Sequence, residues 1–461
     1  MQNYYFIGAG GIGMANLERY FLSLGCKVGG YDRTPSPLTA ELTAEGVDMI
    51  YEDDPSAVSD VFRNPADTVV VYTPAVPADS ALLSYFRNGG FNVMKRARLL
   101  GEITRSLKSI CVAGSHGKTT TCSMTANILR QPGAPGCNAF LGGILRNTGS
   151  NLVLCAGSEW AVIEADEYDR SFHHLSPTIA VVTSVDPDHL DIYGDEEGYL
   201  EGFSHFTSLI RKGGYLLMHT GLKLQPKTSE DVTVMTYSGG SEGDWHAEDI
   251  EIGDGKITFT LTGPDRLRFK GLSPGVPVEI NVDNAVAAAA ASILAGAGES
   301  EIREGLSTFK GAKRRFEIHL DGSEGTPVLI DDYAHSPNEI RASIRSVKKL
   351  FPGRHVSVIF QPHLYSRTRD FADDFALALS EADSLIMPEI YPARELPIPG
   401  VDSLMVLEKT SAKEKQYCER KDLLNLVKNS NFDVLMTLGA ADIDLLLPDI
   451  KAILKTKKRL S

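Results

Sequence analysis

The sequence predicts an α/β protein with three domains, on the basis of its length, its strand pattern and two glycine-rich turns. With 461 residues, the chain is long enough for about three domains of ordinary size. Short apolar runs alternate with helical patterns, which is typical of parallel sheets covered by helices. The expected domains are residues 1–103, a Rossmann-like unit; residues 104–312, a P-loop unit with a parallel sheet; and residues 313–461, a second Rossmann-like α/β unit.

The composition is typical of a globular cytoplasmic protein. Charged residues make up 23% and hydrophobic residues 43%, and no apolar run is long enough to span a membrane. The N-terminus enters a strand without a basic leader, so no signal peptide is expected. A net charge of −14 argues against nucleic acid as a partner. The six cysteines form no CxxC pattern, which favours reduced thiols over a disulfide framework or a zinc site.

A glycine-rich turn follows the first predicted strand. Residues 4–7 form the strand, and Gly8, Gly10 and Gly13 form the turn that precedes a helical pattern. A second strand ends at Asp32, where dinucleotide-binding folds place a carboxylate on a ribose hydroxyl. On these residues alone a nicotinamide or flavin is the default ligand, although any diphosphate can use such a turn.

Two further strands in this region indicate an anion site. They are predicted at residues 68–72 and 92–94, and they end close to Thr73 and Arg96. Ligands of a doubly wound parallel sheet bind at the carboxyl ends of its strands, so Arg96 is a candidate anion contact. The alternative is a solvated arginine within a basic run.

The second glycine-rich turn has the composition of a phosphate-binding loop. An apolar strand at residues 109–113 is followed by Gly114, Gly117, Lys118, Thr119 and Thr120. The glycines let backbone N–H groups turn toward an anion, and the following helix points the positive end of its dipole at the same place. Lys118 is expected at the terminal phosphates and the Thr119 hydroxyl at a magnesium ion. Val112 stands where the strict pattern has a glycine, so Gly114 has to supply the flexibility.

Acidic residues follow the next predicted strands. The strand at residues 160–163 runs into a carboxylate-rich segment at 164–169 that begins with Glu164. A divalent cation is the economical way to offset such repulsion, and a solvated acidic turn is the alternative. A strand at residues 179–183 leads to another acidic segment that contains His189. His189 is therefore a second candidate ligand.

The remaining segments give less specific indications. The stretch 137–151, rich in Gly and Asn, is expected to be a substrate-facing loop. Asn281 opens an alanine-rich helix, where it either caps the helix or faces a base. Beyond residue 312, predicted strands deliver His and Arg side chains to turns, where a closing domain could contact phosphate or carboxylate.

Seven motifs, in this order, resemble those of the Mur ligases. They are residues 8–13, 114–120, 164–167, 188–191, 313–316, 331–335 and 361–369. The resemblance covers nearly the whole chain. It implies a three-domain enzyme of peptidoglycan synthesis, and therefore of cell wall biogenesis, cell shape and cell division. The N-terminal turn is then expected to hold the diphosphate of a UDP-sugar, so the nicotinamide interpretation is withdrawn.

Within the family, the motifs are most similar to those of the members that join L-alanine to UDP-N-acetylmuramate, with ATP and Mg²⁺ as cofactors. The catalytic residues that this resemblance implies are Lys118, Glu164, His189, Arg315 and His335. The implied nucleotide contacts are Gly114, Gly117, Lys118, Thr119, Thr120, Asn281, Arg315 and Asp332. The implied metal ligands are Thr119, Glu164 and His189. The implied substrate contacts are Gly10, Gly11, Gly13, Asp32, Thr73, Arg96, Tyr333, His363 and Arg367.

The chain departs from the family pattern at a few positions. Ile280 stands in place of a usual His, Ser336 in place of a second His, and Leu364 in place of an Arg. The last change removes an expected substrate cation, so it bears most on the alanine side. No Lys occurs between His189 and Lys212, so a second Mg²⁺ would lack the carbamylated lysine that many relatives use.

The implied reaction is ATP-driven amide formation through an acyl phosphate. Lys118, Mg²⁺ and an arginine are expected to offset charge while the carboxylate is held in line; no base for the amine is identifiable. The alternatives are a ligase that attaches a preformed tripeptide to the same sugar nucleotide, a nicotinamide-dependent oxidoreductase fused to a nucleotide switch, and a non-catalytic ATP-binding scaffold. Joints near Ile103 and Gly311 predict rigid-body closure of the domains.

Overall fold

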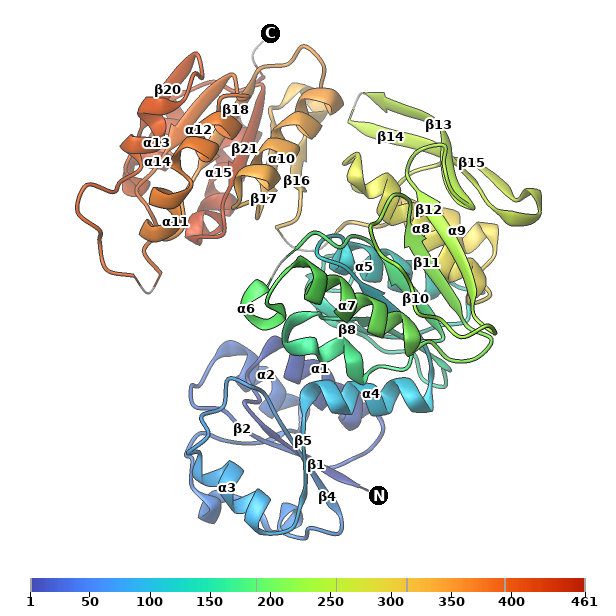
Figure 1. The fold of residues 1–461 in the computed structure, drawn as a ribbon. Coiled ribbons are helices and arrows are strands. Elements are labelled where there is room, and N and C mark those ends of the chain that lie inside the picture. Colours follow the sequence, from blue (N-terminus) through green and yellow to red (C-terminus); the bar gives the residue numbers. More distant parts are fainter. Residues whose placement is uncertain (1, 188, 254, 312–313, 394, 460–461) are drawn as a thin grey trace. The chain divides into compact units, whose positions relative to one another are not determined.

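Three sheets form the framework of the chain (Figure 1). The computed structural model describes residues 2–187, 189–253, 255–311, 314–393 and 395–459. The chain divides into two compact units, the first made of Met1–His246, Leu261–Arg268 and Asp283–Leu306. The second is made of Ala247–Thr260, Phe269–Val282 and Ser307–Ser461.

The first unit opens with a five-stranded parallel sheet in the order β3-β2-β1-β4-β5. Its elements are β1 (Asn3–Ile7), α1 (Ile12–Ser23), β2 (Val28–Tyr31), α2 (Pro37–Glu45), β3 (Asp48–Ile50), β4 (Thr68–Tyr72), α3 (Ala81–Asn88), β5 (Asn92–Lys95) and α4 (Arg96–Ser106). Successive β1 side chains face opposite sides of the sheet. Tyr5 therefore packs in the hydrophobic cluster that contains Phe86, and Phe6 packs in the cluster that contains Met14. The strand order reverses between β1 and β4, and the turns after these two strands therefore flank the expected ligand crevice.

A ten-stranded sheet follows, in the order β15-β14-β13-β12-β11-β10-β6-β9-β7-β8. Its elements are β6 (Lys108–Ala113), α5 (Lys118–Leu129), β7 (Asn138–Leu145), β8 (Ser150–Val153), β9 (Trp160–Glu164), β10 (Ile179–Val182), α6 (Leu190–Tyr193), α7 (Glu196–Ser208), β11 (Tyr215–His219), β12 (Thr233–Ser238), β13 (Trp245–Gly253), β14 (Lys256–Thr262), β15 (Arg268–Leu272), α8 (Ile280–Leu294) and α9 (Glu299–Ser307). Strands β10, β6 and β9 are parallel neighbours. Because parallel strands end at the same edge, the segments after these three strands meet there.

The prediction that residues 137–151 form a loop is wrong. Strand β7 pairs in parallel with β9 and antiparallel with β8, and Phe140 and Leu145 are buried. The pairing of β7 with β8 shifts register between Phe140 and Leu145, where Gly142 and Gly143 lie. Glycines that suggest a loop in the sequence are thus accommodated in an irregular hairpin.

The second unit contains a six-stranded sheet in the order β16-β17-β21-β18-β19-β20. Its elements are β16 (Glu317–Asp321), β17 (Val328–Asp332), α10 (Pro337–Leu350), β18 (Val356–Phe360), α11 (Tyr365–Asp370), α12 (Ala372–Leu379), β19 (Ser384–Met387), α13 (Leu404–Lys409), β20 (Glu414–Tyr417), α14 (Leu423–Asn429), β21 (Val434–Leu438) and α15 (Leu447–Lys455). All its pairs are parallel except β16 with β17. The predicted α/β class is therefore confirmed.

The predicted domain boundaries stay predictions. Helix α4 continues through residue 103. The boundary at residues 312 and 313 lies outside the described residues, as do Asp188 and Lys313 of two predicted motifs. Among the helices that the structure describes, none is long and apolar enough to cross a membrane.

Candidate functional site

The turn after β6 has the backbone geometry of a phosphate-binding loop. Gly114 and Gly117 have φ angles of 143° and 82°, in the region that favours glycine. Helix α5 begins at Lys118, directly after the turn, so its first N–H groups and its dipole are available to an anion there. The His116 N–H donates to Ser184 Oγ at 2.8 Å. This bond braces the turn against the segment that follows β10.

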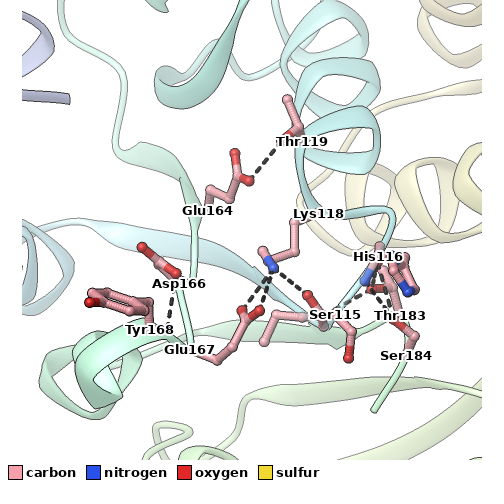
Figure 2. Close-up of polar contacts among 12 residues, drawn as sticks. Ser115, His116, Lys118, Thr119, Glu164, Asp166, Glu167, Tyr168, Thr183 and Ser184 are labelled. Atoms are coloured by element: carbon pink, nitrogen blue, oxygen red, sulfur yellow. Dashed lines mark hydrogen bonds and ion pairs between the residues drawn. The ribbon is translucent and has the colours of Figure 1, made fainter. Parts of the chain in front are cut away.

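Thr119 and Glu164 place two side chains with potential metal-ligand oxygens beside this turn. Thr119 Oγ1 donates to Glu164 Oε1 at 2.7 Å (Figure 2). The Gly142 N–H donates to Glu164 Oε2 at 2.8 Å. Hydroxyl and carboxylate oxygens suit Mg²⁺, which is usually held by one or two side chains together with substrate phosphates. The described residues contain no cluster of three or more His, Cys, Asp or Glu that could hold a metal by itself. The pair therefore fits Mg²⁺ shared with a nucleotide.

Lys118 makes an ion pair with a buried carboxylate. Its Nζ lies 2.9 Å and 2.8 Å from the two oxygens of Glu167 and also donates to the Gly114 carbonyl (Figure 2). The exposed fractions of the two side chains are 14% for Lys118 and 3% for Glu167. In the sequence, Glu167 is only one member of an acidic run, and nothing there assigns it a partner.

His189 lies in the segment that follows β10. Its φ is 52°, an uncommon value for a residue with a side chain, and such strain often marks functional sites. Its ring packs edge-to-face on Tyr168, with the ring centroids 5.2 Å apart. Its role as a metal ligand stays a prediction.

A cavity of about 370 Å³ in the first unit is lined by the first glycine-rich turn and by Lys118, which directly follows the second. The residues that line it include Gly11, Gly13, Thr73, Arg96, Lys118, Gly142, Glu164 and Asp166. A second cavity of about 390 Å³ is also lined by Thr73, Arg96 and Asp166, with Lys95, Tyr168 and Asp169. Four of the predicted substrate contacts, Gly11, Gly13, Thr73 and Arg96, therefore line one cavity together with Lys118, which is one of the predicted nucleotide contacts.

Arg96 is the most distinctive cation of these cavities. Burial lowers the pKa of its guanidinium, and Asp166 and Glu164 oppose that shift. Within the described ranges its side chain has no hydrogen bond or ion pair. A Cβ at position 13 would overlap the guanidinium, so only glycine lets Arg96 lie against the turn. A largely buried cation with no hydrogen-bonded partner among the described residues is suited to an anionic ligand.

Asp32 supports the first turn. Its two carboxylate oxygens accept from the Gly10 N–H at 2.7 Å and from the Thr34 N–H at 3.0 Å. The carboxylate therefore holds the turn in shape, and its contact with a ribose stays a prediction.

In the second unit, Asp332, Tyr333 and His335 lie where β17 ends. Asp332 Oδ2 accepts from Ser343 Oγ at 2.6 Å, and burial raises the pKa of the Asp332 carboxyl. The Tyr333 ring is 42% exposed and packs edge-to-face on His335, with the ring centroids 5.2 Å apart. Arg315 is exposed. The neighbouring Arg314, in contrast, binds Asp331, Asp444 and two backbone carbonyls of its own unit.

One departure from the family pattern, Ser336, has a local structural explanation, and that of Leu364 has none. Ser336 is the N-cap of α10, and its side chain and that of Glu339 form a capping box. Leu364 is the N-cap of α11 with a φ of 71°, and its N–H donates to the Tyr391 carbonyl at 3.0 Å. Capping boxes stabilise helix starts, so serine at position 336 contributes to the fold.

His363 and Asn281 complete the predicted residues of the second unit. His363 Nδ1 is a buried atom without a hydrogen-bond partner among the described residues, and burial lowers the pKa of the imidazole. Arg367 lies one helical turn further on, in α11, and raises the positive potential at His363. Asn281 is buried, and its Nδ2 donates to the Val276 carbonyl at 3.1 Å.

Asn284 contacts the phosphate-binding loop, which the sequence did not reveal. Its Oδ1 accepts from Thr121 Oγ1 at 3.1 Å, and a Cβ at position 117 would lie 2.8 Å from it. The available signal was its place near the start of the alanine-rich helix, three residues after Asn281.

The fold and this site together define a P-loop nucleotide-binding protein. Three family models match the chain: "Mur ligase family, catalytic domain" over residues 3–108, "Mur ligase middle domain" over 112–292, and "Mur ligase, glutamate ligase domain" over 314–440. The chain belongs to the Mur ligase family. It is therefore an ATP-dependent ligase that forms amide bonds.

Similar proteins cover the chain from end to end. UDP-N-acetylmuramate–L-alanine ligase of Parabacteroides distasonis is 54% identical over 98% of this chain and 96% of the relative. The enzyme of that name from Phocaeicola vulgatus is 50% identical over 99% of each chain. A solved structure of UDP-N-acetylmuramate-alanine ligase from Thermotoga maritima matches with a TM-score of 0.76 at 26% identity, over 99% of each chain. A murein peptide ligase from Psychrobacter arcticus, 22% identical with a TM-score of 0.59, shares the fold.

Proposed function

We propose that this protein joins L-alanine to the carboxylate of UDP-N-acetylmuramate, converting ATP to ADP and phosphate, in the cytoplasmic synthesis of peptidoglycan precursors. One observation carries the proposal: a single cavity is lined by the first glycine-rich turn, by Arg96, and by Lys118 and Glu164 of the phosphate-binding region. A reaction between a sugar nucleotide and ATP needs both groups of contacts around one space. The full-length relatives of 54% and 50% identity are named for this activity.

The two ends of the cavity hold different phosphates in this proposal. The backbone of Gly10, Gly11 and Gly13 and the guanidinium of Arg96 bind the diphosphate of the sugar nucleotide. The loop from Gly114 to Thr120 binds the phosphates of ATP. Enclosing both ligands brings the muramate carboxylate in line with the γ-phosphate, and such positioning is one of the two main contributions to catalysis of phosphoryl transfer.

The chemistry takes two displacements. The muramate carboxylate attacks the γ-phosphorus and ADP leaves; the alanine amine then attacks the acyl carbon and phosphate leaves. Lys118 stabilises charge on the transferred phosphoryl oxygens. Mg²⁺, held by Thr119 and Glu164 and expected also at His189, would neutralise further charge on the phosphates when bound.

Residues of the second unit keep the roles expected for them. Asn281, Arg315 and Asp332 are proposed as nucleotide contacts, and His335 as a catalytic residue. Tyr333, His363 and Arg367 are proposed near the muramate carboxylate and the alanine. The buried, unpaired His363 Nδ1 supports this, because such an atom is available to a ligand.

The test measures ADP release with UDP-N-acetylmuramate, ATP and Mg²⁺ and with L-alanine, L-serine, glycine or a muramyl tripeptide as acceptor. Fastest turnover with L-alanine is the expected result, and it would show that Leu364 is tolerated. Turnover with the tripeptide alone would move the protein to recycling of cell wall peptides. ADP release that needs no acceptor, or none with any of them, would contradict the proposal.

A further inference from the structure

The ammonium of Lys118 already has an acceptor for each of its protons. Nζ contacts Glu167 Oε1 at 2.9 Å and Oε2 at 2.8 Å, and it donates to the Gly114 carbonyl. A lysine ammonium has three donors. A phosphate that is to bind Lys118 must therefore replace at least one of these contacts.

A buried aromatic pair contacts the backbone of Glu167. The Glu167 carbonyl accepts from the Tyr193 hydroxyl at 2.6 Å and from the Arg170 N–H at 3.0 Å. Tyr193 packs edge-to-face on Tyr199, with the ring centroids 5.0 Å apart. The Tyr199 hydroxyl lies 3.0 Å from Ser115 Oγ, which belongs to the phosphate-binding turn itself. The position of the Glu167 carboxylate is thus fixed by contacts that run through Tyr193 and Tyr199 to the phosphate-binding turn.

We propose that Glu167 is a placeholder anion for the terminal phosphates of the nucleotide. Glu167 pairs with Lys118 in the protein without nucleotide and is replaced there when a phosphate binds. This inference rests on the proposed function of the loop. A buried lysine without a counterion is costly, so the pair stabilises the protein before nucleotide binds. The same carboxylate competes with the phosphates for Lys118 and repels them, and it therefore weakens nucleotide binding. Glu167 is a positioning residue that acts through Lys118.

The proposal predicts opposite signs for stability and affinity in Glu167→Gln. The amide keeps the size of the side chain but loses its charge and one of its two acceptor oxygens. Midpoints of urea unfolding without nucleotide should fall. The Kd for Mg-ADP and for a non-hydrolysable ATP analogue, measured by titration calorimetry, should fall about tenfold, which is the range for a charged hydrogen bond.

A matched control is Glu159→Gln. Glu159 pairs with Lys108 at 3.0 Å on the surface, and both side chains are exposed. The pair lies where β6 and β9 begin, at the ends of these strands away from the phosphate-binding turn. Its removal should change neither the Kd for nucleotide nor, beyond a small amount, the unfolding midpoint. If Glu167→Gln does not fold, Tyr193→Phe removes only the hydroxyl that holds the Glu167 carbonyl, and it should lower the Kd by about threefold at most.

Nucleotide binding that is unchanged or weaker in Glu167→Gln overturns the placeholder role, because a purely structural glutamate would lower stability and affinity together. The same holds if Tyr193→Phe weakens binding. Failure of the wild-type protein to bind Mg-ADP would instead contradict the proposed function, so the two failures are distinguishable.

Discussion

Two cations of the first unit are held in contrasting ways. Lys118 is paired with Glu167, whereas Arg96 faces the cavity without a counterion among the described residues. A guanidinium is more weakly hydrated than an ammonium and stays charged when buried, so it tolerates burial without an ion pair before an anion binds. The ammonium of lysine is more strongly hydrated, so its burial costs more and a counterion at Lys118 offsets that cost.

Glu164 is the side chain on which the metal assignment depends most. Replacement by Gln keeps the hydrogen bond from Thr119 Oγ1 but removes the charge that attracts Mg²⁺. We expect kcat to fall by about 100-fold or more and the Mg²⁺ concentration for half-maximal rate to rise, as measured by ADP release over a magnesium titration. Glu201→Gln, which breaks an exposed pair with Lys227, is the control. An unchanged magnesium dependence in Glu164→Gln would exclude Glu164 as a ligand.

Asp331 makes the stability of the second unit depend on pH. It is fully buried in β17, and burial raises the pKa of its carboxyl from 3.8 to about 6 despite hydrogen bonds from Thr437 and Arg314. Because the pKa of Asp331 is higher in the folded state than in the unfolded state, its protonated form stabilises the fold, fully so below pH 4. This contribution to the free energy of unfolding is lost as the pH rises through 6. A shift of about two pKa units corresponds to roughly 3 kcal/mol.

The variant Asp331→Asn isolates this effect. The difference in unfolding free energy between wild type and variant, from urea titrations between pH 4 and 8, should move against the wild type by up to roughly 3 kcal/mol as the pH rises. The control is Asp373→Asn, because Asp373 is exposed and pairs with Lys409 on the surface. A flat difference for Asp331→Asn would show that its carboxyl titrates normally.

At the scale of elements, the site is built from the ends of parallel strands. Strands β10, β6 and β9 are neighbours, and they deliver the His189 segment, the phosphate-binding turn and Glu164 to one edge. The turn after β1 has the equivalent position in the first sheet. The two glycine-rich turns, residues 8–11 and 114–117, are short, so their positions are set by the rigid strands and helices that they join.

Gly13 tests how closely helix α1 must approach Arg96. In Gly13→Ala the new Cβ overlaps the guanidinium and forces Arg96 away. We expect the KM for UDP-N-acetylmuramate to rise about tenfold or more, as for the loss of a charged hydrogen bond, while the KM for ATP stays nearly constant. Gly253→Ala is the matched control, because a Cβ there meets nothing within 4 Å. Equal rises in both KM values would argue for general damage to the first unit.

At the scale of the whole molecule, a protein with a net charge of −14 binds two anionic substrates in the proposed reaction. The long-range field opposes binding, and local groups have to overcome it. Arg96, Lys118 and the N-terminus of α5 are such groups, and each lies beside a glycine that allows the ligand to approach the backbone closely.

Ligand binding should therefore appear in global stability. UDP-N-acetylmuramate at about 100 times its Kd is expected to raise the unfolding free energy by about 2.7 kcal/mol in urea titrations. Gly13→Ala at the same ligand concentration should show a smaller rise. No stabilisation of the wild type by the sugar nucleotide would count against its binding to the native state.

The sequence alone predicted most of the strands and both glycine-rich turns, because these depend on short-range properties. An apolar run of five residues and a glycine with positive φ are local features, and so is the Ser336 to Glu339 capping pattern. Side-chain partners could not be predicted in this way. Lys118 and Glu167 are 49 positions apart, and Thr119 and Glu164 are 45 apart.

Tertiary structure also decided how ambiguous segments are used. The glycines near Gly142 suggested a loop, and pairing of β7 with β9 made them part of a sheet whose backbone holds Glu164. Arg96 could have been a solvated residue, and the packing of α1 and α4 placed it over Gly13 in the cavity. Local backbone preference is encoded by neighbouring residues, whereas the counterion, burial and reach of a side chain depend on which distant strands and helices are packed beside it.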